Sequence, residues 1–401
     1  MRTGLDRLPR LEPLLGELRS RRVGLLAHPA SVDGRLVHIS RILRELGVAP
    51  TIVLGPEHGY GGEAQDMIGV EDAVDEAGTQ VVSLYGDSLT DLSPKPEHLA
   101  KMDVLVVDLA DVGSRYYTFV WTALLALREA ARAGVQTIVL DRPNPIGGAA
   151  SQVEGRSQAD GFLSFVGWER VPVRHSMTVG EVLARFAASD GLTLGRDGAL
   201  RVVAVEDWDR ERLADVWDRP FVLTSPNMPT LETALVYPGG CLIEGTNLSE
   251  GRGTTRPFEI VGAPFVDGPR LAAALNSSGL EGFVARPLTF QPTFQKHAKK
   301  TCGGVQIHVV DPKRFRPYAT YLALVAHAAA QAPEHFAFRT ERYEFVDDIP
   351  AFDLLTGSAI ARKAITDGAA LGDWLESVAS AEPGWDTALR EASSLVERAA
   401  P

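Results

Sequence analysis

The chain has 401 residues, of which 45% are hydrophobic and 23% are charged, and its formal net charge at pH 7 is -12. This composition is typical of a globular protein that is long enough for two domains and a large core. The net negative charge argues against double-stranded nucleic acid and against an anionic membrane surface as partners, because both attract a basic protein face.

Cysteine content and the N-terminal residues bear on the cellular compartment. The two cysteines, Cys241 and Cys302, show no CxxC or Cys/His zinc spacing, so we expect two buried thiols in a reducing compartment. Residues 1–20 carry charges every few positions, and no stretch approaches the ~18 apolar residues of a membrane span. We therefore expect a soluble cytoplasmic protein without a signal peptide.

Short apolar runs alternate with helical patterns through the first 145 residues. The predicted strands are residues 22–30, 51–59, 80–87, 103–113 and 136–145, and the helices between them are residues 36–47 and 118–134. The strands are continuous runs of Val, Ile and Leu, which is typical of strands that are buried on both faces. The pattern predicts an α/β fold with a doubly wound, mostly parallel sheet covered by helices.

The middle of the chain is less regular. Thr178 with Glu181 three residues later predicts a helix N-terminus, and residues 200–208 are a further strand candidate. Residues 223–264 are dense in Pro, Gly, Ser, Thr and Asn and show little periodicity. A segment of this length without periodicity is usually disordered or functional, and its scattered apolar residues favour an ordered segment that forms a site.

From about residue 260 the pattern changes to extended pieces between helices. The extended pieces are residues 258–264, 283–290, 303–311 and 336–345, and the helices are residues 268–278, 318–332 and 368–400. We interpret this part as a smaller α+β domain. The predicted division is a catalytic domain over residues 1–255 and a smaller domain over residues 256–401 that closes an active-site cleft.

Polar side chains follow five successive predicted strands, at the point where each strand ends. They are His28, then Glu57 and His58, then Tyr85 and Asp87, then Asp108, Asp111, Arg115 and Tyr116, and finally Asp141, Arg142 and Asn144. Ligands of open α/β sheets bind outside the carboxyl ends of the strands, so we expect a site there. Helix capping is the alternative for some of these residues, Asp87 above all.

Missing motifs exclude several enzyme classes. No GxGxxG follows the first strand, no GxxxxGK[ST] occurs, and no GxSxG occurs. Dinucleotide enzymes, P-loop enzymes and α/β-hydrolases are therefore disfavoured. No HxH or HExxH spacing is present, so we expect no metal site, and the sequence implies no cofactor.

The residues at the predicted strand ends are mainly carboxylates, arginines and aromatic rings. This combination suits carbohydrate chemistry. Glycoside cleavage usually needs a carboxylic acid for the leaving oxygen and a second group at the anomeric carbon. Aromatic rings such as Tyr85 and Tyr116 either pack on sugar faces or belong to the core. Arg115, Arg142 and Arg252 either bind a carboxylate on the sugar or pair with nearby aspartates.

Seven motifs occur in an order that resembles a bacterial family of NamZ-type exo-β-N-acetylmuramidases. They are GPEHGYGGEAQD, VSLYGD, DVGSRYYTFVWT, VLDRPNPIGG, SFVGWERVPVRHSMTVGE, SPNMPTLETALVYPGGCLIEGTNLSEGRGTTRPFEIVGAP and PTFQKHAKKTCGGVQIHV. The resemblance runs from about residue 20 to about residue 360. It implies a Rossmann-like domain and a smaller C-terminal domain with the active site between them. It also implies release of N-acetylmuramic acid from the non-reducing end of peptidoglycan fragments.

The resemblance assigns roles to particular residues. The glutamate of the family's PEHG motif falls on Glu57, the implied catalytic acid, and His58 is its neighbour. Asp111 and Glu244 are the candidates for the second catalytic group. The residues expected to bind substrate are His28, Tyr85, Arg115, Tyr116, Arg142, Asn144, Asn227 and Arg252.

Two departures from the family pattern matter for function. Many members have glutamine where this chain has Ala110, which removes a possible hydrogen bond near the anomeric centre. Many members are exported, whereas this sequence shows no signal peptide, so we expect imported wall fragments as substrates. The alternatives are a muropeptide-binding protein that has lost catalysis and a hydrolase of another acidic amino sugar.

Overall fold

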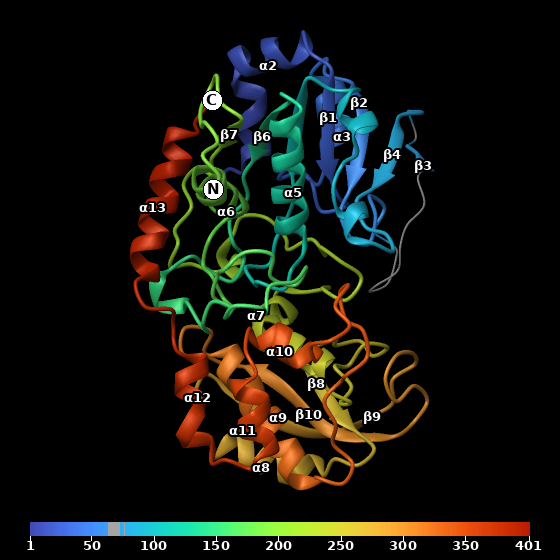
Figure 1. Ribbon diagram of the computed structural model, residues 1–401, viewed down its shortest axis with the longest axis vertical. Coiled ribbons are helices and arrows are strands. Elements are labelled where there is room, and N and C mark those ends of the chain that lie inside the picture. Colours follow the sequence, from blue (N-terminus) through green and yellow to red (C-terminus); the bar gives the residue numbers. More distant parts are fainter. Residues whose placement is uncertain (63–72, 76) are drawn as a thin grey trace.

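A computed structural model describes residues 1–62, 73–75 and 77–401 and divides them between two sheets (Figure 1). The larger sheet has the order β3-β4-β2-β1-β5-β6-β7. All its described pairings are parallel except that of β3 with β4. The strands are β1 (Val23–Ala27), β2 (Pro50–Gly55), β3 (Ala73–Val74), β4 (Gln80–Ser83), β5 (Val104–Asp108), β6 (Gln136–Leu140) and β7 (Leu200–Val203). This arrangement confirms the predicted α/β class.

Helices cover both faces of the larger sheet, because its strands are apolar on both faces. One face packs on α1 (Gly4–Arg7), α2 (Glu12–Arg19) and α3 (Ile39–Glu45). The other packs on α5 (Phe119–Arg132), α6 (Val179–Ser189) and α13 (Trp385–Arg398). The Thr178 side chain accepts a hydrogen bond from the Glu181 amide at the start of α6, and this confirms the predicted N-cap.

The second part of the chain contains an antiparallel sheet of order β8-β10-β9. Its strands are β8 (Ile260–Ala263), β9 (Phe283–Phe290) and β10 (Cys302–Val309). The helices around it are α7 (Leu231–Gly240), α8 (Gly268–Asn276), α9 (Pro317–Gln331), α10 (Ala351–Thr356), α11 (Ile360–Thr366) and α12 (Leu371–Ala379). In Figure 1 this part lies below the larger sheet.

The chain crosses between the two parts more than once. Helix α7 packs against α9 of the smaller part, whereas α13 returns and packs against α6 and β7 of the larger part (Figure 1). The Val202 amide donates to the Ala399 carbonyl at 2.8 Å. The predicted division at residues 255 and 256 stays a prediction.

Three local predictions differ from the structure. The helix predicted over residues 368–400 is divided into α12, which packs on α9, and α13, which packs on α6. Residues 231–240 form α7, although Pro238 and two glycines lie in it. Most of this helix is buried, so its sequence lacks the amphipathic period that reveals a surface helix. Residues 336–345, predicted as extended, form isolated bridges, Thr246 with Phe338 and Tyr343 with Val346.

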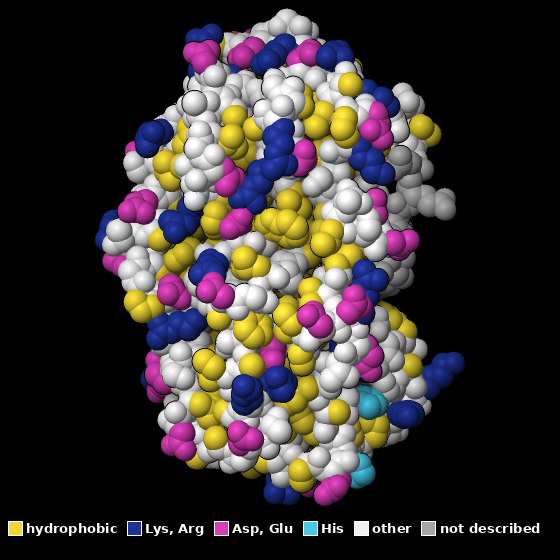
Figure 2. All heavy atoms as spheres, viewed as in Figure 1, with side chains coloured by type: hydrophobic (Ala, Val, Ile, Leu, Met, Phe, Trp, Pro, Cys, Tyr) yellow, Lys and Arg dark blue, Asp and Glu magenta, His cyan; other side chains and the backbone are white. Residues whose placement is uncertain are grey.

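The distribution of surface charge and the lengths of the helices concern possible nucleic-acid and membrane partners. Lys and Arg side chains are interspersed with Asp and Glu over the face in Figure 2. None of the helices in the described residues is long and apolar enough to cross a membrane.

Candidate active site

A pocket with an empty volume of about 490 Å³ lies beyond the carboxyl end of β2 and the start of α5. Its walls combine carboxylates, a guanidinium and aromatic rings from both parts of the chain. The described lining residues are Glu57, His58, Tyr116, Tyr117, Thr118, Phe119, Val166, Ser225, Asn227, Met228, Tyr237, Glu244, Arg252, Phe258, Tyr343 and Glu344. We call it the Glu57 pocket.

A tight turn after β2 places Glu57 in this pocket. The strand ends at Gly55, and the Gly59 amide donates to the Pro56 carbonyl at 3.0 Å. The turn folds back so closely that a Cβ on Gly55 would lie 2.4 Å from the Tyr60 nitrogen. His58 has φ 70°, a strained conformation that clusters at functional sites. The polar end of β2 is therefore a constrained turn that buries Glu57.

Thr118 fixes the carboxyl group of Glu57. The Thr118 hydroxyl donates to Glu57 Oε2 at 2.6 Å. Thr118 is the N-cap residue of α5, yet its side chain makes no capping hydrogen bond. A threonine at this position usually accepts from a helix amide, so here its hydroxyl orients Glu57 instead.

Glu244, Arg252 and Tyr343 form a buried hydrogen-bonded group on the wall contributed by the second part of the chain. Arg252 donates from Nη2 to Glu244 Oε1 at 2.8 Å, and the Tyr343 hydroxyl donates to Glu244 Oε2 at 2.7 Å. Both carboxylate oxygens of Glu244 are therefore engaged. Charge-assisted contacts of this kind hold a guanidinium in a defined orientation.

A second carboxylate, that of Glu250, lies near the Arg252 guanidinium. Glu250 Oε1 lies 3.9 Å from Arg252 Nε, and Glu250 Oε2 lies 2.9 Å from Lys296 Nζ. Burial alone would raise the pKa of Glu250, but Lys296 and Arg252 hold that pKa below its usual value. Glu250 therefore stays ionised and stabilises the positive charge of Arg252.

Glu344 is a third buried carboxyl group in the pocket lining. The Tyr85 hydroxyl donates to Glu344 Oε2 at 3.3 Å. Glu344 and Phe345 have φ values of 44° and 70°, and two successive non-glycine residues in this region mark a strained backbone. Strain of this kind persists only where the surroundings enforce it, and here it turns Glu344 toward the pocket.

Two family models together match most of the chain. The model described as exo-β-N-acetylmuramidase NamZ, N-terminal, matches residues 23–232, and its C-terminal counterpart matches residues 235–392. The chain belongs to the NamZ exo-β-N-acetylmuramidase family.

Named relatives of this NamZ-family chain agree with the models. The peptidoglycan β-N-acetylmuramidase NamZ of Bacillus subtilis (strain 168) is 39% identical over 379 residues, which are 94% of this chain and 87% of the relative. A crystal structure of a DUF1343 family protein from Bacteroides fragilis NCTC 9343 has a TM-score of 0.82 and 29% identity, and the match covers 99% and 97% of the two chains. A second such protein, at 23% identity, has a TM-score of 0.69, covers 100% and 98%, and shares the fold.

Six of the residues predicted for the site line the Glu57 pocket of this NamZ-family chain, as far as the structure describes it. They are Glu57, His58, Tyr116, Asn227, Glu244 and Arg252. Asp111 and Arg142 line a different pocket, together with Ala110. The departure at Ala110 therefore lies outside the Glu57 pocket.

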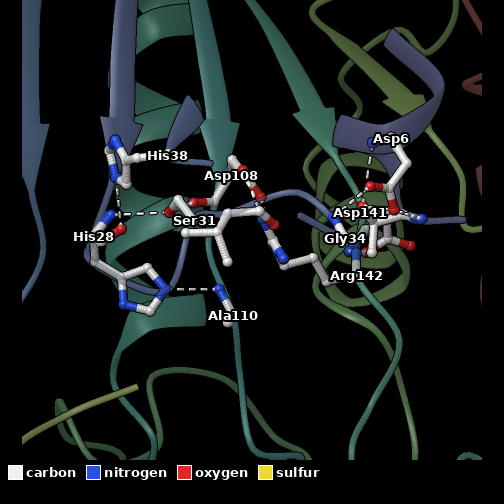
Figure 3. Close-up of polar contacts among 12 residues, drawn as sticks. Asp6, His28, Ser31, Gly34, His38, Asp108, Ala110, Asp141 and Arg142 are labelled. Atoms are coloured by element: carbon white, nitrogen blue, oxygen red, sulfur yellow. Dashed lines mark hydrogen bonds and ion pairs between the residues drawn. The ribbon is translucent and has the colours of Figure 1, made fainter. Parts of the chain in front are cut away.

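The remaining predicted residues of the NamZ-family chain contact other protein groups. His28 is buried and its Nε2 accepts from the Ala110 amide at 2.9 Å (Figure 3). Burial, followed by the nearby Arg142, lowers the pKa of His28 to about 3. Asn144 donates to the Met177 carbonyl at 3.1 Å and accepts from the Ile146 amide at 3.1 Å. Tyr85 is not among the lining residues of the described pocket, but its hydroxyl donates to Glu344, which is.

Arg115, expected on the substrate, instead joins backbone segments in the interior. Its guanidinium is fully buried and donates to the carbonyls of Arg156 at 2.8 Å, Val171 at 3.0 Å and Leu355 at 2.6 Å. These contacts tie the larger part of the chain to the end of α10.

We expect Arg115→Met to destabilise the protein by on the order of 3 kcal/mol, because three carbonyls, two of them in fully buried hydrogen bonds, lose their donors. Denaturant or thermal unfolding measures the loss. Arg41→Met is the matched control, since Arg41 makes an exposed ion pair with Glu45 and such pairs contribute at most about 1 kcal/mol. Equal stability of the two variants would contradict the structural role.

The sequence reasoning missed Glu344, Tyr343 and Thr118. Glu344 lies in the piece Arg-Tyr-Glu-Phe, where a lone carboxylate stands between aromatic residues. That arrangement is a weak signal for a buried acid, and periodicity alone predicts only an extended piece there.

Proposed function

We propose that the chain is an exo-acting glycoside hydrolase that releases N-acetylmuramic acid from the non-reducing end of peptidoglycan fragments. The observation that carries this proposal is the Glu57 pocket, which combines buried carboxyl groups with an oriented guanidinium. The Bacillus subtilis relative, described as a peptidoglycan β-N-acetylmuramidase, supports the same activity. The substrates are a muramoyl disaccharide or a muropeptide.

In this mechanism Glu57 is the general acid. It protonates the glycosidic oxygen while the bond from that oxygen to the anomeric carbon breaks. The Thr118 hydroxyl, 2.6 Å from Oε2, holds the carboxyl group in a fixed orientation in the pocket.

The second group is Glu344. Glu244 has both oxygens engaged by Arg252 and Tyr343, and Asp111 lines the other pocket. Glu344 is buried in the same lining as Glu57, and its backbone strain turns it toward the pocket. It acts on the anomeric carbon, directly as a nucleophile in a retaining reaction or through a water in an inverting one.

One assay tests the activity itself. The protein is incubated with a nitrophenyl N-acetylmuramide, its glucosaminide analogue and a muramoyl-glucosamine disaccharide. We expect release from both muramides and little from the glucosaminide. Binding of the disaccharide without release would indicate a binding protein, and release from the glucosaminide alone would contradict the proposed substrate.

Arg252 is predicted to bind the lactyl carboxylate that distinguishes muramic acid from glucosamine. We expect Arg252→Met to lower kcat/KM for the muramide relative to the glucosaminide by about 10- to 100-fold, the value of a charge-assisted hydrogen-bond pair. Both kcat/KM values are measured on the same preparation, so their ratio does not depend on how much of the variant is folded. An unchanged ratio would exclude this role for Arg252.

A further inference from the structure

The connection between β9 and β10 contains part of the motif PTFQKHAKKTCGGVQIHV, to which the proposed mechanism gives no role. It covers residues 291–301, and we call it the β9–β10 loop. Gln295, His297 and Lys299 have φ values of 64°, 57° and 62°, so alternate residues of this loop adopt a left-handed conformation that is rare without glycine. Strain of this kind persists only where the surroundings enforce it. The contacts of the loop therefore indicate what it does.

The β9–β10 loop packs along residues 243–253, which contribute a carboxylate and a guanidinium to the Glu57 pocket. We call these residues the wall segment. The Thr293 amide and hydroxyl both donate to the Gly253 carbonyl, each at 2.9 Å. His297 Nε2 donates to the Asn247 carbonyl at 2.7 Å. The loop is thus joined to the wall segment at more than one point.

Between these two contacts, Lys296 places its ammonium group among oxygen atoms of the wall segment. Nζ donates to the carbonyls of Ile243 at 2.8 Å, Thr246 at 2.9 Å and Leu248 at 2.9 Å. Glu250 Oε2 lies 2.9 Å from the same nitrogen. Four oxygens therefore surround one cation at distances typical of charge-assisted hydrogen bonds. An ammonium group has three N–H donors, so all of them are used within the protein.

The backbone of the wall segment explains why it needs such a cation. After the 3-10 helix at Cys241–Gly245 ends, the wall segment forms isolated bridges through Thr246 and Ser249 rather than a helix or a sheet strand. Its buried carbonyls need other partners, because a buried polar group without a hydrogen bond is costly. The Lys296 ammonium is a shared partner for three of them.

The charge of Lys296 also affects Arg252. Glu250 Oε1 lies 3.9 Å from Arg252 Nε, and Glu244 Oε1 accepts from Arg252 Nη2 at 2.8 Å. Arg252 therefore faces two carboxylates, and Lys296 compensates the charge of one of them. Without Lys296, the buried Glu250 carboxylate would compete with an incoming carboxylate for the Arg252 guanidinium.

We propose that Lys296 is a positioning residue for substrate selection, a built-in cation that holds the wall segment and keeps Arg252 available for the carboxylate of the sugar. Lys296 is not among the described lining residues of the Glu57 pocket, so it acts through Glu250 and the wall segment. The inference rests on the proposed function, because the carboxylate that Arg252 binds there is the lactyl group of N-acetylmuramic acid.

Lys296→Ala tests the inference with two substrates that differ in the lactyl carboxylate. We expect the ratio of kcat/KM for the nitrophenyl muramide to kcat/KM for the glucosaminide to fall about three- to tenfold, a coupling usual within one hydrogen-bonded network. A general loosening of the fold would lower both values equally. Because Lys296 acts through Arg252, Lys296→Ala should lower the ratio no further in an Arg252→Met background. An unchanged ratio in the single variant would overturn the inference.

Propylammonium replaces the part of the side chain that Lys296→Ala removes. It supplies the same charge and the same three N–H donors, so it should raise the unfolding temperature of this variant and restore the ratio of the two kcat/KM values. Propanol, which has the same length and no charge, should restore neither. Recovery of the unfolding temperature without the ratio would overturn the positioning role and leave a structural one. Equal recovery with propanol would exclude the role of the charge.

Lys300→Ala is the matched control, because Lys300 lies on the same β9–β10 loop and is exposed. It should leave the ratio and the unfolding temperature unchanged, and propylammonium should have no effect on it. The unmodified chain, in which Lys296 already fills the position, should also be insensitive to propylammonium.

Binding separates a failure of this inference from a failure of the proposed function. If the unmodified chain cleaves neither substrate, the proposed activity is wrong, and calorimetry then compares its affinities for N-acetylmuramic acid and N-acetylglucosamine. Lys296→Ala should lower the ratio of these affinities by the same factor as above. An unchanged ratio would overturn the inference alone, and no binding of N-acetylmuramic acid to the unmodified chain would overturn both.

Discussion

Glu57→Gln is expected to lower kcat on the muramoyl-glucosamine disaccharide by at least ~10²–10⁴-fold, the usual contribution of a general acid. Glutamine keeps the size of the side chain and still accepts from the Thr118 hydroxyl, but it cannot supply the proton that the leaving sugar oxygen needs. Initial rates at saturating substrate, measured by sugar release, give the loss. Unfolding curves should stay close to those of the unmodified chain.

A substrate with a good leaving group distinguishes a general acid from a residue with another catalytic role. Nitrophenolate leaves without protonation, so Glu57→Gln should lose much less activity on the nitrophenyl muramide than on the disaccharide. Thr118→Val removes the hydroxyl that orients Glu57. It should also lower activity more on the disaccharide than on the nitrophenyl muramide, but by a smaller factor than Glu57→Gln. Equal losses on both substrates would show that Glu57 acts on the anomeric carbon instead.

Much of the sheet was predictable, because strands buried on both faces need continuous apolar runs. Five of the seven strands of the larger sheet coincide with runs of Val, Ile and Leu in residues 22–145. The order of the strands was not predictable, since the residues of a strand do not reveal which strands lie beside it in the sheet. Helix α7 was missed for a related reason, because burial on most sides removes the period that identifies a helix.

The same limit applies to the site. Glu57 could be predicted because its signal is local: an apolar strand ends at a glycine-rich turn. The other carboxylates of the pocket, Glu244 and Glu344, could not, because they lie far from Glu57 in the sequence. Tyr85 and Glu344, which share a hydrogen bond, are 259 residues apart. Five polar strand ends were expected to form one site, but the structure divides their loops between two pockets.

The arginines show why residue type alone does not assign a role. Arg115 is surrounded by backbone carbonyls. Arg142 is held by both oxygens of Asp108. Arg252 also has carboxylate partners, yet it lines the Glu57 pocket. The difference lies in which surface each guanidinium faces, and that depends on tertiary contacts.

Glu344→Gln is expected to lower kcat by at least ~10²-fold on both the disaccharide and the nitrophenyl muramide. Glu344 acts on the anomeric carbon in either mechanism, so a better leaving group does not compensate for its loss. This pattern is opposite to that of Glu57→Gln. Glu244→Gln, which changes a carboxylate engaged by Arg252 and Tyr343, should mainly change KM.

Chemical rescue distinguishes a reacting carboxylate from a structural one. Glu344 has φ 44°, a conformation that glycine adopts readily, so Glu344→Gly should relieve strain as it opens a space beside the anomeric carbon. Azide in that space should attack the carbon as nitrophenolate leaves, which restores release of nitrophenolate and gives a glycosyl azide. A structural glutamate would show no such rescue. The anomer that appears first in ¹H NMR with the unmodified chain then decides between Glu344 as nucleophile, with retention, and Glu344 as base, with inversion.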